Sequence, residues 1–338
     1  MFGKTSTKDV IANVLSKEFK VLKTEGNLNN HIGLPLTLLK LKNHTAVVIE
    51  MGMNHFGEIS LLTNIAKPTV CVITNIGTAH IGILGSRENI LKAKLEILEG
   101  LKKNGPVIIN NDNDLLHKWA EENKGKYNIY TYGIENKSNY LATQIKENNN
   151  TTYYINGKLA QNPIPGIHFI YNALSAYAVG DILGINNEKI IEAIKDFKLT
   201  AKRMDVKIIK NNIKIINDSY NASYDSMKAS LETIKLETTR RKIAVLGDML
   251  ELGEFAKELH QKVGEEVVKN DVDILITVGE YAKEIANKAQ ELNMKEIYSF
   301  NNIKDASNYL KSIIKGNDII LLKASNAMNF SKILEYLN

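Results

Sequence analysis

Runs of β-branched residues and helical apolar stripes alternate along the first third of the chain. The clearest run, at 45–51, is continuous, as is typical of a strand buried on both faces of a parallel sheet. The predicted strands of this part are 20–24, 45–51, 69–75 and 105–110. The predicted helices are 5–19, 58–66 and 86–103. This alternation predicts an α/β domain with a mostly parallel sheet.

The pattern changes beyond Asp114, where short runs rich in Tyr and Thr replace the long apolar ones. The predicted strands here are 127–132, 141–146 and 151–155. An Asn-Gly pair at 156–157 is typical of a tight hairpin turn, so we expect a small antiparallel insert. Two helices follow, one that includes 173–179 and one at 187–197.

Near residues 199–205 the helical spacing of apolar residues ends and short apolar runs begin again. Apolar runs at 206–209 and 213–217 flank an Asn-Asn pair and predict a hairpin. From residue 241 strands and helices alternate, which indicates a doubly wound parallel α/β domain. The predicted strands are 242–246, 274–278, 296–300 and 318–323, and the predicted helices are 256–270, 280–292, 302–315 and 327–337. We therefore expect two domains, 1–202 and 203–338.

Composition narrows the class of partner. The 338 residues include 44% hydrophobic and 24% charged residues, which is ordinary for a globular protein. The net charge of +5, from 43 basic and 38 acidic residues, is spread along the chain without a basic tract. The distribution argues against a nucleic-acid partner and favours small anionic ligands.

The single cysteine, Cys71, lies in an apolar run and excludes an intrachain disulfide, which fits a reducing cytoplasm. No apolar stretch reaches about 20 residues, so no membrane span is expected. The first residues also lack the charged-then-apolar pattern of a secretory signal. We expect a cytoplasmic protein.

The first candidate for chemistry is the triplet Gly3-Lys4-Thr5, which has the form of the end of a phosphate-binding loop. In such loops backbone N–H groups wrap an oxyanion, the Lys reaches the terminal phosphates and the hydroxyl ligates magnesium. A bare triplet is also compatible with an ordinary surface turn. A full loop has an earlier Gly and a buried strand that leads into it, and both would precede residue 1.

Two further candidates follow buried strands. Glu50 ends the run at 45–51, and His80 comes just after the strand at 69–75. The carboxyl ends of parallel strands are where α/β sheets place ligand-binding groups. The alternatives are a carboxylate at a sheet edge in water and a structural histidine.

Seven motifs occur in a fixed order. They are G-K-T-S-T-K, G-N-L-N-N-H-I-G-L-P-L, E-M-G-M-N-H-F-G-E-I, T-N-I-G-T-A-H, G-S-R-E-N-I-L-K-A-K-L-E-I, N-D-S-Y-N-A and L-G-D-M-L-E-L-G-E. Through them, essentially the whole chain resembles the Mur ligases of peptidoglycan synthesis. The resemblance is greatest to the branch that joins D-alanyl-D-alanine to UDP-N-acetylmuramoyl-tripeptide.

The resemblance implies an α/β fold with a central P-loop ATPase domain, which has a mostly parallel sheet and a small antiparallel insert. A C-terminal Rossmann-like domain follows, and the two close over ATP about a hinge near 200–205. Members of the family also have an N-terminal domain that binds the UDP-sugar. We expect this chain to lack that domain and the start of the phosphate loop, and so to turn over ATP weakly or not at all by itself.

The implied reaction is the phosphorylation of the tripeptide carboxylate by ATP, with Mg²⁺, to an acyl phosphate. The amine of D-alanyl-D-alanine then attacks the acyl carbon and phosphate leaves. Because charge builds up on the phosphoryl oxygens, catalysis depends mostly on metal ions and cations held in line.

The resemblance also implies roles for individual residues. The implied catalytic residues are Lys4, Glu50, His80, Lys94 and Arg203. The implied metal ligands are Thr5, Glu50, His80 and Lys94, the last of them carbamylated to an oxygen ligand that suits a hard cation. The implied ATP contacts are Gly3, Lys4, Thr5, Ser6, Asn172, Asp218, Tyr220 and Asn221. The implied substrate contacts are Asn27, Asn29, Asn30, Lys323 and Ser325.

Three segments depart from the family pattern: His168-Phe169, Tyr220 to Tyr224 and Lys323 to Met328. The first removes one potential hydrogen bond to adenine, and the last, which lacks the Arg and Gly of the family pattern, puts the contacts to the dipeptide in question. Two alternatives stay open: a folylpolyglutamate-synthetase-like ligase and a non-catalytic nucleotide-binding module. We expect a monomer.

Overall fold

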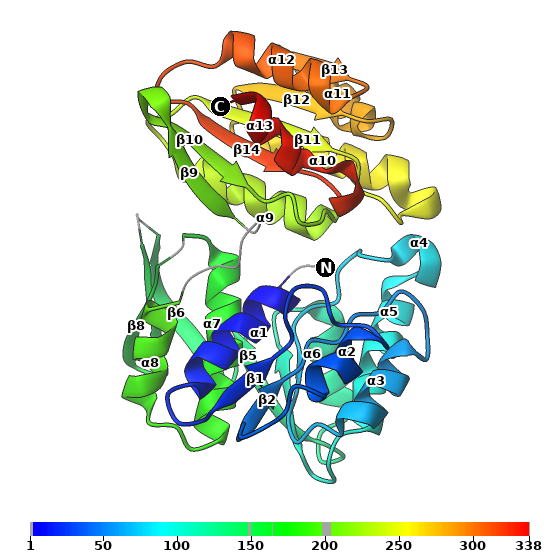
Figure 1. Cartoon of the computed structure of the whole chain (residues 1–338), viewed down its shortest axis with the longest axis vertical. Coiled ribbons are helices and arrows are strands. Elements are labelled where there is room, and N and C mark those ends of the chain that lie inside the picture. Colours follow the sequence, from blue (N-terminus) through cyan, green and yellow to red (C-terminus); the bar gives the residue numbers. More distant parts are fainter. Residues whose placement is uncertain (1–2, 148–149, 164, 198–203, 338) are drawn as a thin grey trace. The chain divides into compact units, whose positions relative to one another are not determined.

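The structure is a computed structural model that describes residues 3–147, 150–163, 165–197 and 204–337 (Figure 1). Its residues divide into two compact units. The central unit comprises the described residues of Gly3–Ile76 and Ile83–Lys198. The C-terminal unit comprises those of Leu199–Asn338 together with the segment Gly77–Gly82. The predicted boundary between residues 202 and 203 falls outside the described residues.

The central unit contains two sheets flanked by helices. Its strands are β1 (Val21–Lys23), β2 (Ala46–Val48), β3 (Cys71–Ile73), β4 (Pro106–Asn110), β5 (Asn128–Gly133), β6 (Tyr140–Glu147), β7 (Thr151–Ile155) and β8 (Lys158–Asn162). Its helices are α1 (Lys4–Leu15), α2 (Gly33–Leu38), α3 (Glu58–Ala66), α5 (Arg87–Leu95), α6 (Asp114–Glu122), α7 (Ile167–Ile182) and α8 (Asn187–Lys195). The 3-10 turn η1 (Glu96–Glu99) extends α5. The short helix α4 (Ile81–Leu84) follows β3, and its first two residues group with the C-terminal unit.

The two sheets of this unit are of unequal size. Strands β1 and β2 pair in parallel as a two-stranded sheet, and the other six pair in the order β3-β4-β5-β6-β7-β8. Pairing is parallel from β3 to β6 and antiparallel from β6 to β8. The prediction of an antiparallel insert is confirmed for β6 to β8. It is wrong for 127–132, because β5 pairs in parallel with both of its neighbours.

Helix α1 owes its position to α7, against which it packs. Val14 is fully buried, and a Cβ placed on Gly180 would lie 2.7 Å from a methyl carbon of Val14, so only glycine lets the two helices approach this closely. Most of α7 is buried, because its apolar residues are not confined to one stripe. This contact fixes the helix that begins at the candidate phosphate loop.

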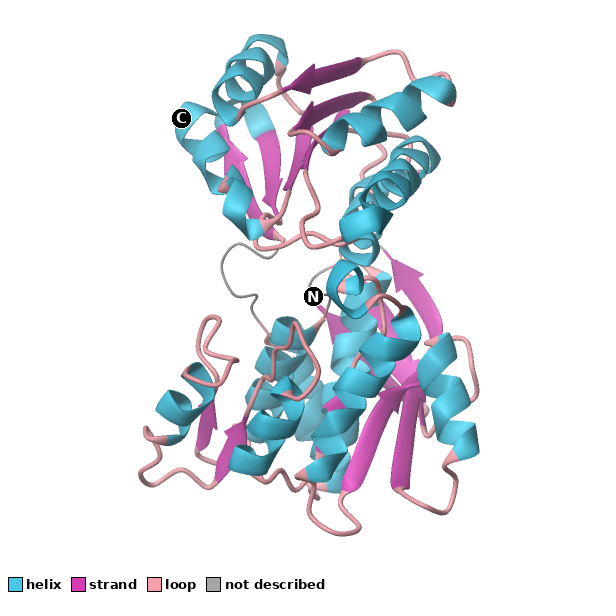
Figure 2. Cartoon of the chain, turned by 90° about the vertical axis from the view of Figure 1, so that its right-hand side faces the viewer, coloured by secondary structure: helices cyan, strands magenta, loops and turns pink. Residues whose placement is uncertain are grey.

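The C-terminal unit is a single sheet with helices around it (Figure 2). Its strands are β9 (Asp205–Ile209), β10 (Ile213–Asn217), β11 (Lys242–Gly247), β12 (Ile274–Val278), β13 (Ile297–Phe300) and β14 (Ile319–Lys323). Its helices are α9 (Tyr224–Lys235), α10 (Ala256–Lys269), α11 (Ala282–Glu291), α12 (Ile303–Ile313) and α13 (Ile333–Leu337). The order is β13-β12-β11-β14-β10-β9, and only β9 runs antiparallel to its neighbour. The doubly wound domain and the 206–217 hairpin are confirmed.

Several elements differ from the predictions. The helices at 33–38, 81–84, 114–122 and 224–235 and the strand at 158–162 were not predicted. The helix predicted at 327–337 is broken into the 3-10 turns Asn326–Met328 and Phe330–Lys332 before α13, because Asn329 has a left-handed φ of 53° between them. Among the described helices, none combines the length and the apolar character needed to cross a membrane.

Candidate nucleotide and metal site

The first turn of α1 forms an anion-attracting end in the central unit. Gly3 caps it with a φ of 86°, which favours glycine, and its carbonyl accepts a hydrogen bond from the Thr7 N–H at 2.8 Å. The described residues of this turn include no acid. Because the first N–H groups of a helix have no carbonyl one turn before them, they and the helix dipole favour a bound anion. This geometry supports a phosphate end at Gly3, Lys4, Thr5 and Ser6.

Asn172, on α7, stands next to this loop. Its Oδ1 accepts a hydrogen bond from Thr7 Oγ1 at 2.9 Å, and both side chains are buried. A Cβ on Gly3 would lie 3.5 Å from the same oxygen and 3.9 Å from Thr74. Asn172 therefore holds the first turn of α1, a role that the sequence analysis did not assign to it.

Glu50 follows β2 and is buried, with 6% of its surface exposed. Its N–H donates to Thr24 Oγ1 at 3.0 Å, and its Oε1 accepts from Asn29 Nδ2 at 2.8 Å. Its Oε2 is also buried and has no hydrogen-bond partner among the residues that the structure describes. Burying a carboxylate oxygen without a partner is unfavourable unless a cation binds to it. Glu50 therefore fits the role of a ligand for a hard divalent ion.

Lys94 joins the same region from α5. Its Nζ donates to the Asn75 carbonyl, just past β3, at 2.5 Å. Lys4, Glu50 and Lys94 all line one cavity of about 560 Å³ in the central unit. The structure thus brings together three of the predicted catalytic residues.

A site made only of acids and imidazoles is absent from the described residues, which contain no group of three or more His, Cys, Asp or Glu side chains able to hold a metal. An ion in this unit would need other oxygen donors. The hydroxyl of Thr5, which is buried in the first turn of α1, and the carboxylate of Glu50 are of the type that magnesium prefers.

His80 groups with the C-terminal unit, and the structure does not place it relative to Glu50. It has a left-handed φ of 67°, and its Nδ1 lies 2.7 Å from Glu251 Oε2. The neighbouring Thr78 donates through both its N–H and its hydroxyl to Asp225 Oδ2. Glu251 belongs to the L-G-D-M-L-E-L-G-E motif, so the sequence carried a signal for it that the predictions did not use.

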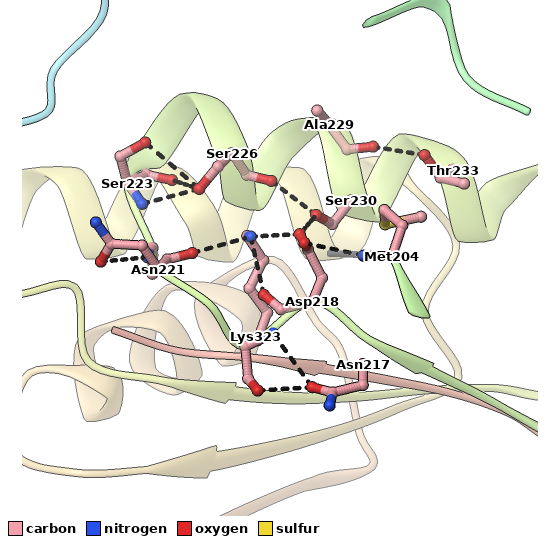
Figure 3. A network of polar contacts seen from close by, with 12 residues as sticks. Met204, Asn217, Asp218, Asn221, Ser223, Ser226, Ala229, Ser230, Thr233 and Lys323 are labelled. Atoms are coloured by element: carbon pink, nitrogen blue, oxygen red, sulfur yellow. Dashed lines mark hydrogen bonds and ion pairs between the residues drawn. The ribbon is translucent and has the colours of Figure 1, made fainter. Parts of the chain in front are cut away.

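Asp218 lies in a network of polar contacts at the end of β10 (Figure 3). Its Oδ2 lies 2.5 Å from Lys323 Nζ and accepts from Ser230 Oγ at 2.7 Å, while its Oδ1 accepts from the Met204 N–H at 3.3 Å. Lys323 also donates to the Asn221 carbonyl at 3.2 Å. The carboxylate is therefore positioned by three groups of its own unit.

The predicted dipeptide contacts are both interior side chains. Lys323 is 1% exposed, and Ser325 is 4% exposed. The Ser325 hydroxyl accepts from the Leu250 N–H at 2.9 Å. In this structure the contacts of both residues stabilise loops of the C-terminal unit.

The three predicted asparagines are placed differently from one another. Asn29 contacts Glu50 as described, and Asn27 is exposed. The Oδ1 of Asn30 accepts from the N–H groups of Ile32 and Gly33 at the start of α2. Tyr220 is half-buried and follows Asp218 closely in the sequence. Arg203 lies outside the residues that the structure describes.

Comparison with known proteins agrees with this arrangement. Residues 2–180 match the family model of the Mur ligase middle domain, and residues 202–326 match that of the Mur ligase glutamate ligase domain. The UDP-N-acetylmuramoyl-tripeptide–D-alanyl-D-alanine ligase of Bacillus subtilis is 38% identical over 341 residues, which cover 99% of this chain and 74% of that protein.

Solved structures give the same result. MurF from Acinetobacter baumannii superposes with a TM-score of 0.91 at 29% identity, over 99% of this chain and 74% of that one. MurF ligase from Thermotoga maritima, in complex with ADP, has a TM-score of 0.87 at 29% identity, over 99% and 77%. The fold and these matches together show that the chain belongs to the Mur ligase family.

Proposed function

We propose that the chain is an ATP-dependent ligase of peptidoglycan precursor synthesis that joins D-alanyl-D-alanine to UDP-N-acetylmuramoyl-tripeptide. The choice of substrates rests on the relative named for this reaction, which is 38% identical across nearly the whole chain. The observation that carries the chemistry is that Lys4, Glu50 and Lys94 line one cavity, which extends along the length of α1.

ATP binds with its phosphates at the first turn of α1. The backbone N–H groups of Lys4, Thr5 and Ser6 face the anion together with the helix dipole. The Lys4 ammonium approaches the β- and γ-phosphates, where it offsets the charge that spreads over the phosphoryl oxygens in the transition state. Arg203 adds a second cation in this proposal.

Magnesium supplies charge neutralisation at the phosphates when it is bound. Thr5 and Glu50 are the residues that would hold the first ion, since Glu50 presents a buried oxygen that no described side chain satisfies. Lys94 in carbamylated form and His80 would serve a second ion. Asn29 keeps the Glu50 carboxylate in one orientation through its 2.8 Å hydrogen bond.

The reaction has two steps. An oxygen of the tripeptide carboxylate attacks the γ-phosphorus, and the bond between that phosphorus and the β,γ-bridging oxygen breaks. ADP departs, and the tripeptide is left as an acyl phosphate. The neutral amine of D-alanyl-D-alanine then attacks the acyl carbon; the C–N bond forms, the C–O bond to phosphate breaks, and the amine releases its proton. The first step converts the carboxylate, which is a poor electrophile, into an acyl phosphate, whose phosphate is a good leaving group.

The remaining contacts are assigned as follows. Asn172 meets the adenine through its amide nitrogen, since its oxygen accepts from Thr7. The ribose side consists of Asp218, Tyr220 and Asn221. The substrate side consists of Asn27, Asn29, Asn30, Lys323 and Ser325. The ligase acts as a cytoplasmic monomer without a nucleic-acid partner.

Calorimetry with Mg-ATP and Mg-ADP, followed by phosphate release, tests the proposal. We expect nucleotide binding that weakens in Glu50→Gln, and slow phosphate release, in keeping with the weak turnover expected of this chain, that requires both the UDP-muramoyl tripeptide and D-alanyl-D-alanine. Release that instead requires a folate and glutamate would assign a folylpolyglutamate-synthetase-like activity. Binding without release under either condition would reduce the chain to a nucleotide-binding module, and no binding at all would overturn the proposal.

A further inference from the structure

Lys8 ends the G-K-T-S-T-K motif, yet the reaction described above gives it no role. It lies on α1 one turn after Lys4, so the two side chains leave the same face of the helix. Lysine is almost never buried without a partner, but Lys8 is only 5% exposed. Its side chain lines the same cavity as Lys4 and Glu50. What Lys8 does therefore depends on the contacts of its ammonium group.

The ion pair with Asp9 does not account for this buried cation. Lys8 Nζ lies 3.2 Å from Asp9 Oδ1, whereas Lys23 Nζ lies 2.7 Å from the same oxygen. Asp9 would therefore keep an ammonium partner if Lys8 were replaced. Lys8 makes a shorter contact elsewhere, because its Nζ donates to the Thr24 carbonyl at 2.6 Å. The feature that depends on Lys8 is this hydrogen bond to Thr24.

Thr24 follows β1 and is fully buried, with 0% of its surface exposed. Its N–H donates to the Val48 carbonyl of β2 at 3.0 Å, as in a parallel ladder. Its hydroxyl accepts from the Glu50 N–H at 3.0 Å, and its carbonyl accepts from Lys8. Helix α1 packs against both strands (Figure 1). Thr24 thus joins α1, β2 and the candidate metal ligand through three different groups.

The hydrogen bond of the Glu50 N–H departs from the ladder between β1 and β2. Earlier in that ladder the Ala46 N–H donates to the Lys20 carbonyl. The pattern of parallel strands repeats every two residues. The equivalent bond four residues further along both strands would therefore join the Glu50 N–H to the Thr24 carbonyl. Instead, that carbonyl accepts from Lys8, and the Glu50 N–H donates to the Thr24 hydroxyl.

We propose that Lys8 is a positioning residue that ends this ladder before Glu50 and so sets the orientation of the candidate metal ligand. By occupying the Thr24 carbonyl, Lys8 directs the Glu50 N–H to the hydroxyl, and Asn29 holds the carboxylate in the resulting position. Because Lys8 lies one turn after Lys4, the helix that presents the phosphate end also places the metal ligand. The inference rests on the proposed nucleotide site.

Unfolding in urea tests the exchange of acceptors without nucleotide or metal. Thr24→Val removes the hydroxyl while Lys8 keeps the carbonyl, so the buried Glu50 N–H loses its acceptor. Adding Lys8→Met frees the carbonyl for that N–H. The effect of Lys8→Met on the urea midpoint should therefore be more favourable, by about 0.5 M, in the Thr24→Val chain than in the Thr24→Ser chain, which keeps the hydroxyl. Equal effects in the two chains would overturn the exchange.

Calorimetry with ADP, with and without Mg²⁺, tests the placement of Glu50. The gain in ADP affinity that Mg²⁺ produces should fall by about tenfold in Lys8→Met, as is typical when a contact that supports a metal ligand is lost. The affinity without Mg²⁺ should fall far less. Lys8→Arg, which can still donate to the carbonyl, should recover part of the gain. Lys23→Met, which removes the other cation at Asp9, is the matched control and should keep it.

The outcomes separate this inference from the proposed function. An equal loss of ADP affinity with and without Mg²⁺ in Lys8→Met would make Lys8 a direct phosphate contact and would overturn its positioning role. An unchanged gain from Mg²⁺ in Lys8→Met would also overturn that role, while the proposed function would stand. If the wild-type chain bound no ADP in either condition, the proposed function and the role of Lys8 in it would both be overturned, and the urea midpoints would still decide whether Lys8 ends the ladder.

Discussion

Asn29 illustrates how one residue can be located by sequence and given its role by structure. It was expected to face the substrate, yet its Nδ2 donates to Glu50 Oε1 while its own carbonyl accepts from the Gly52 N–H at 2.8 Å. A Cβ on Gly52 would lie 2.9 Å from Asn29 Oδ1, so the glycine is what lets the amide come this close. Asn29 is thus a positioning residue for the candidate metal ligand.

Replacing Asn29 by Ala should weaken the Mg²⁺-dependent binding of ADP by about 10- to 100-fold, the range typical for loss of a hydrogen bond to a metal ligand. Calorimetry at several Mg²⁺ concentrations measures this effect. Asn27→Ala, which removes an exposed amide of the same loop, is the matched control and should have no effect. If Asn29→Ala changed only the KM for the tripeptide, the residue would be a substrate contact instead.

The buried pair of Lys323 and Asp218 makes a second prediction at this scale. Lys323→Met leaves the carboxylate of Asp218, which is only 15% exposed, without its cation, so we expect a loss of about 3–5 kcal/mol in the free energy of unfolding. The double variant with Asp218→Asn should recover most of it, because an amide still accepts from Ser230. Urea denaturation measures both, and a double variant as unstable as Lys323→Met would contradict the pairing.

At the scale of elements, loops and helix ends are held by side chains from distant segments. The N-cap position of helix α3 is Gly57, which has no side chain to accept hydrogen bonds from the first turn. Glu96 takes that role from the adjacent turn η1: its Oε1 accepts from the Gly57 N–H at 2.8 Å and its Oε2 from the Ser60 N–H at 3.1 Å. A carboxylate at a helix N-terminus also interacts favourably with the helix dipole.

Glu96→Ala should therefore destabilise the central unit by about 1–3 kcal/mol, since two charge-assisted hydrogen bonds to a helix end are lost. Chemical denaturation followed by Trp119 fluorescence measures the change. Glu121→Ala, which removes an exposed partner of Lys124, should change the free energy by less than about 1 kcal/mol. Equal effects of the two substitutions would show that Glu96 does not cap α3.

His260 does the same for a loop of the C-terminal unit. Its Nε2 accepts from the Met249 N–H at 2.9 Å, and its Nδ1 is 2.6 Å from the Ala256 carbonyl, which fixes the tautomer with hydrogen on Nδ1. Burial lowers the pKa of His260 below its ordinary value of 6.5. The neutral imidazole thus holds the loop that contains Glu251.

Because the folded pKa of His260 is below the unfolded one, the unfolded chain binds the extra proton first as pH falls. The stabilisation is complete above pH 6.5 and decreases as pH falls toward the folded pKa, with a slope of at most about 1.4 kcal/mol per pH unit. Urea titrations between pH 7.5 and 5 should show this slope in the wild-type chain and a smaller one in His260→Gln. An identical slope in the variant would assign the pH dependence to other groups.

Sequence patterns predicted the elements whose burial is regular. The strands β12 and β14 are buried along their whole length and β11 is buried after Lys242, and their continuous apolar runs were recognised within a residue or two. The helix α9 was missed although Met227, Leu231 and Ile234 have helical spacing. Its start is marked by a Ser223–Ser226 capping box, which is not the usual Ser/Thr with Glu/Gln, so no local signal separated it from the preceding motif.

Contacts between distant segments could not be predicted from local pattern. The pairing of β5 in parallel with β4 and β6 depends on which strand edges remain available after folding, which tyrosine-rich composition does not specify. Likewise, the resemblance located Glu50 and Lys94, while their partners Asn29 and the Asn75 carbonyl come from geometry alone.

The whole molecule consists of two units with separate cores, and its natural probes are unevenly distributed between them. The single Cys71 and the single Trp119 both belong to the central unit. Burial raises the pKa of the Cys71 thiol to about 12, so the thiol is unreactive until that unit opens. Far-UV circular dichroism, in contrast, reports on both units.

Substitutions in one unit should therefore move one set of signals. We expect Lys323→Met to lower the midpoint seen by circular dichroism while Trp119 fluorescence and Cys71 labelling keep theirs. Glu96→Ala should lower the fluorescence and labelling midpoints together. Denaturation series with all three probes test this, and a common shift of every probe in both variants would show that the units unfold as one.

The ion pair between Lys323 and Asp218 also constrains how such a chain can evolve. The two residues are 105 positions apart, yet the carboxylate of Asp218 offsets the charge of the buried Lys323 ammonium. A lineage that replaces either one first must pass through a destabilised intermediate, so drift at these positions should occur as paired changes. Among descendants of a common ancestor, the two positions should therefore vary together or remain constant together.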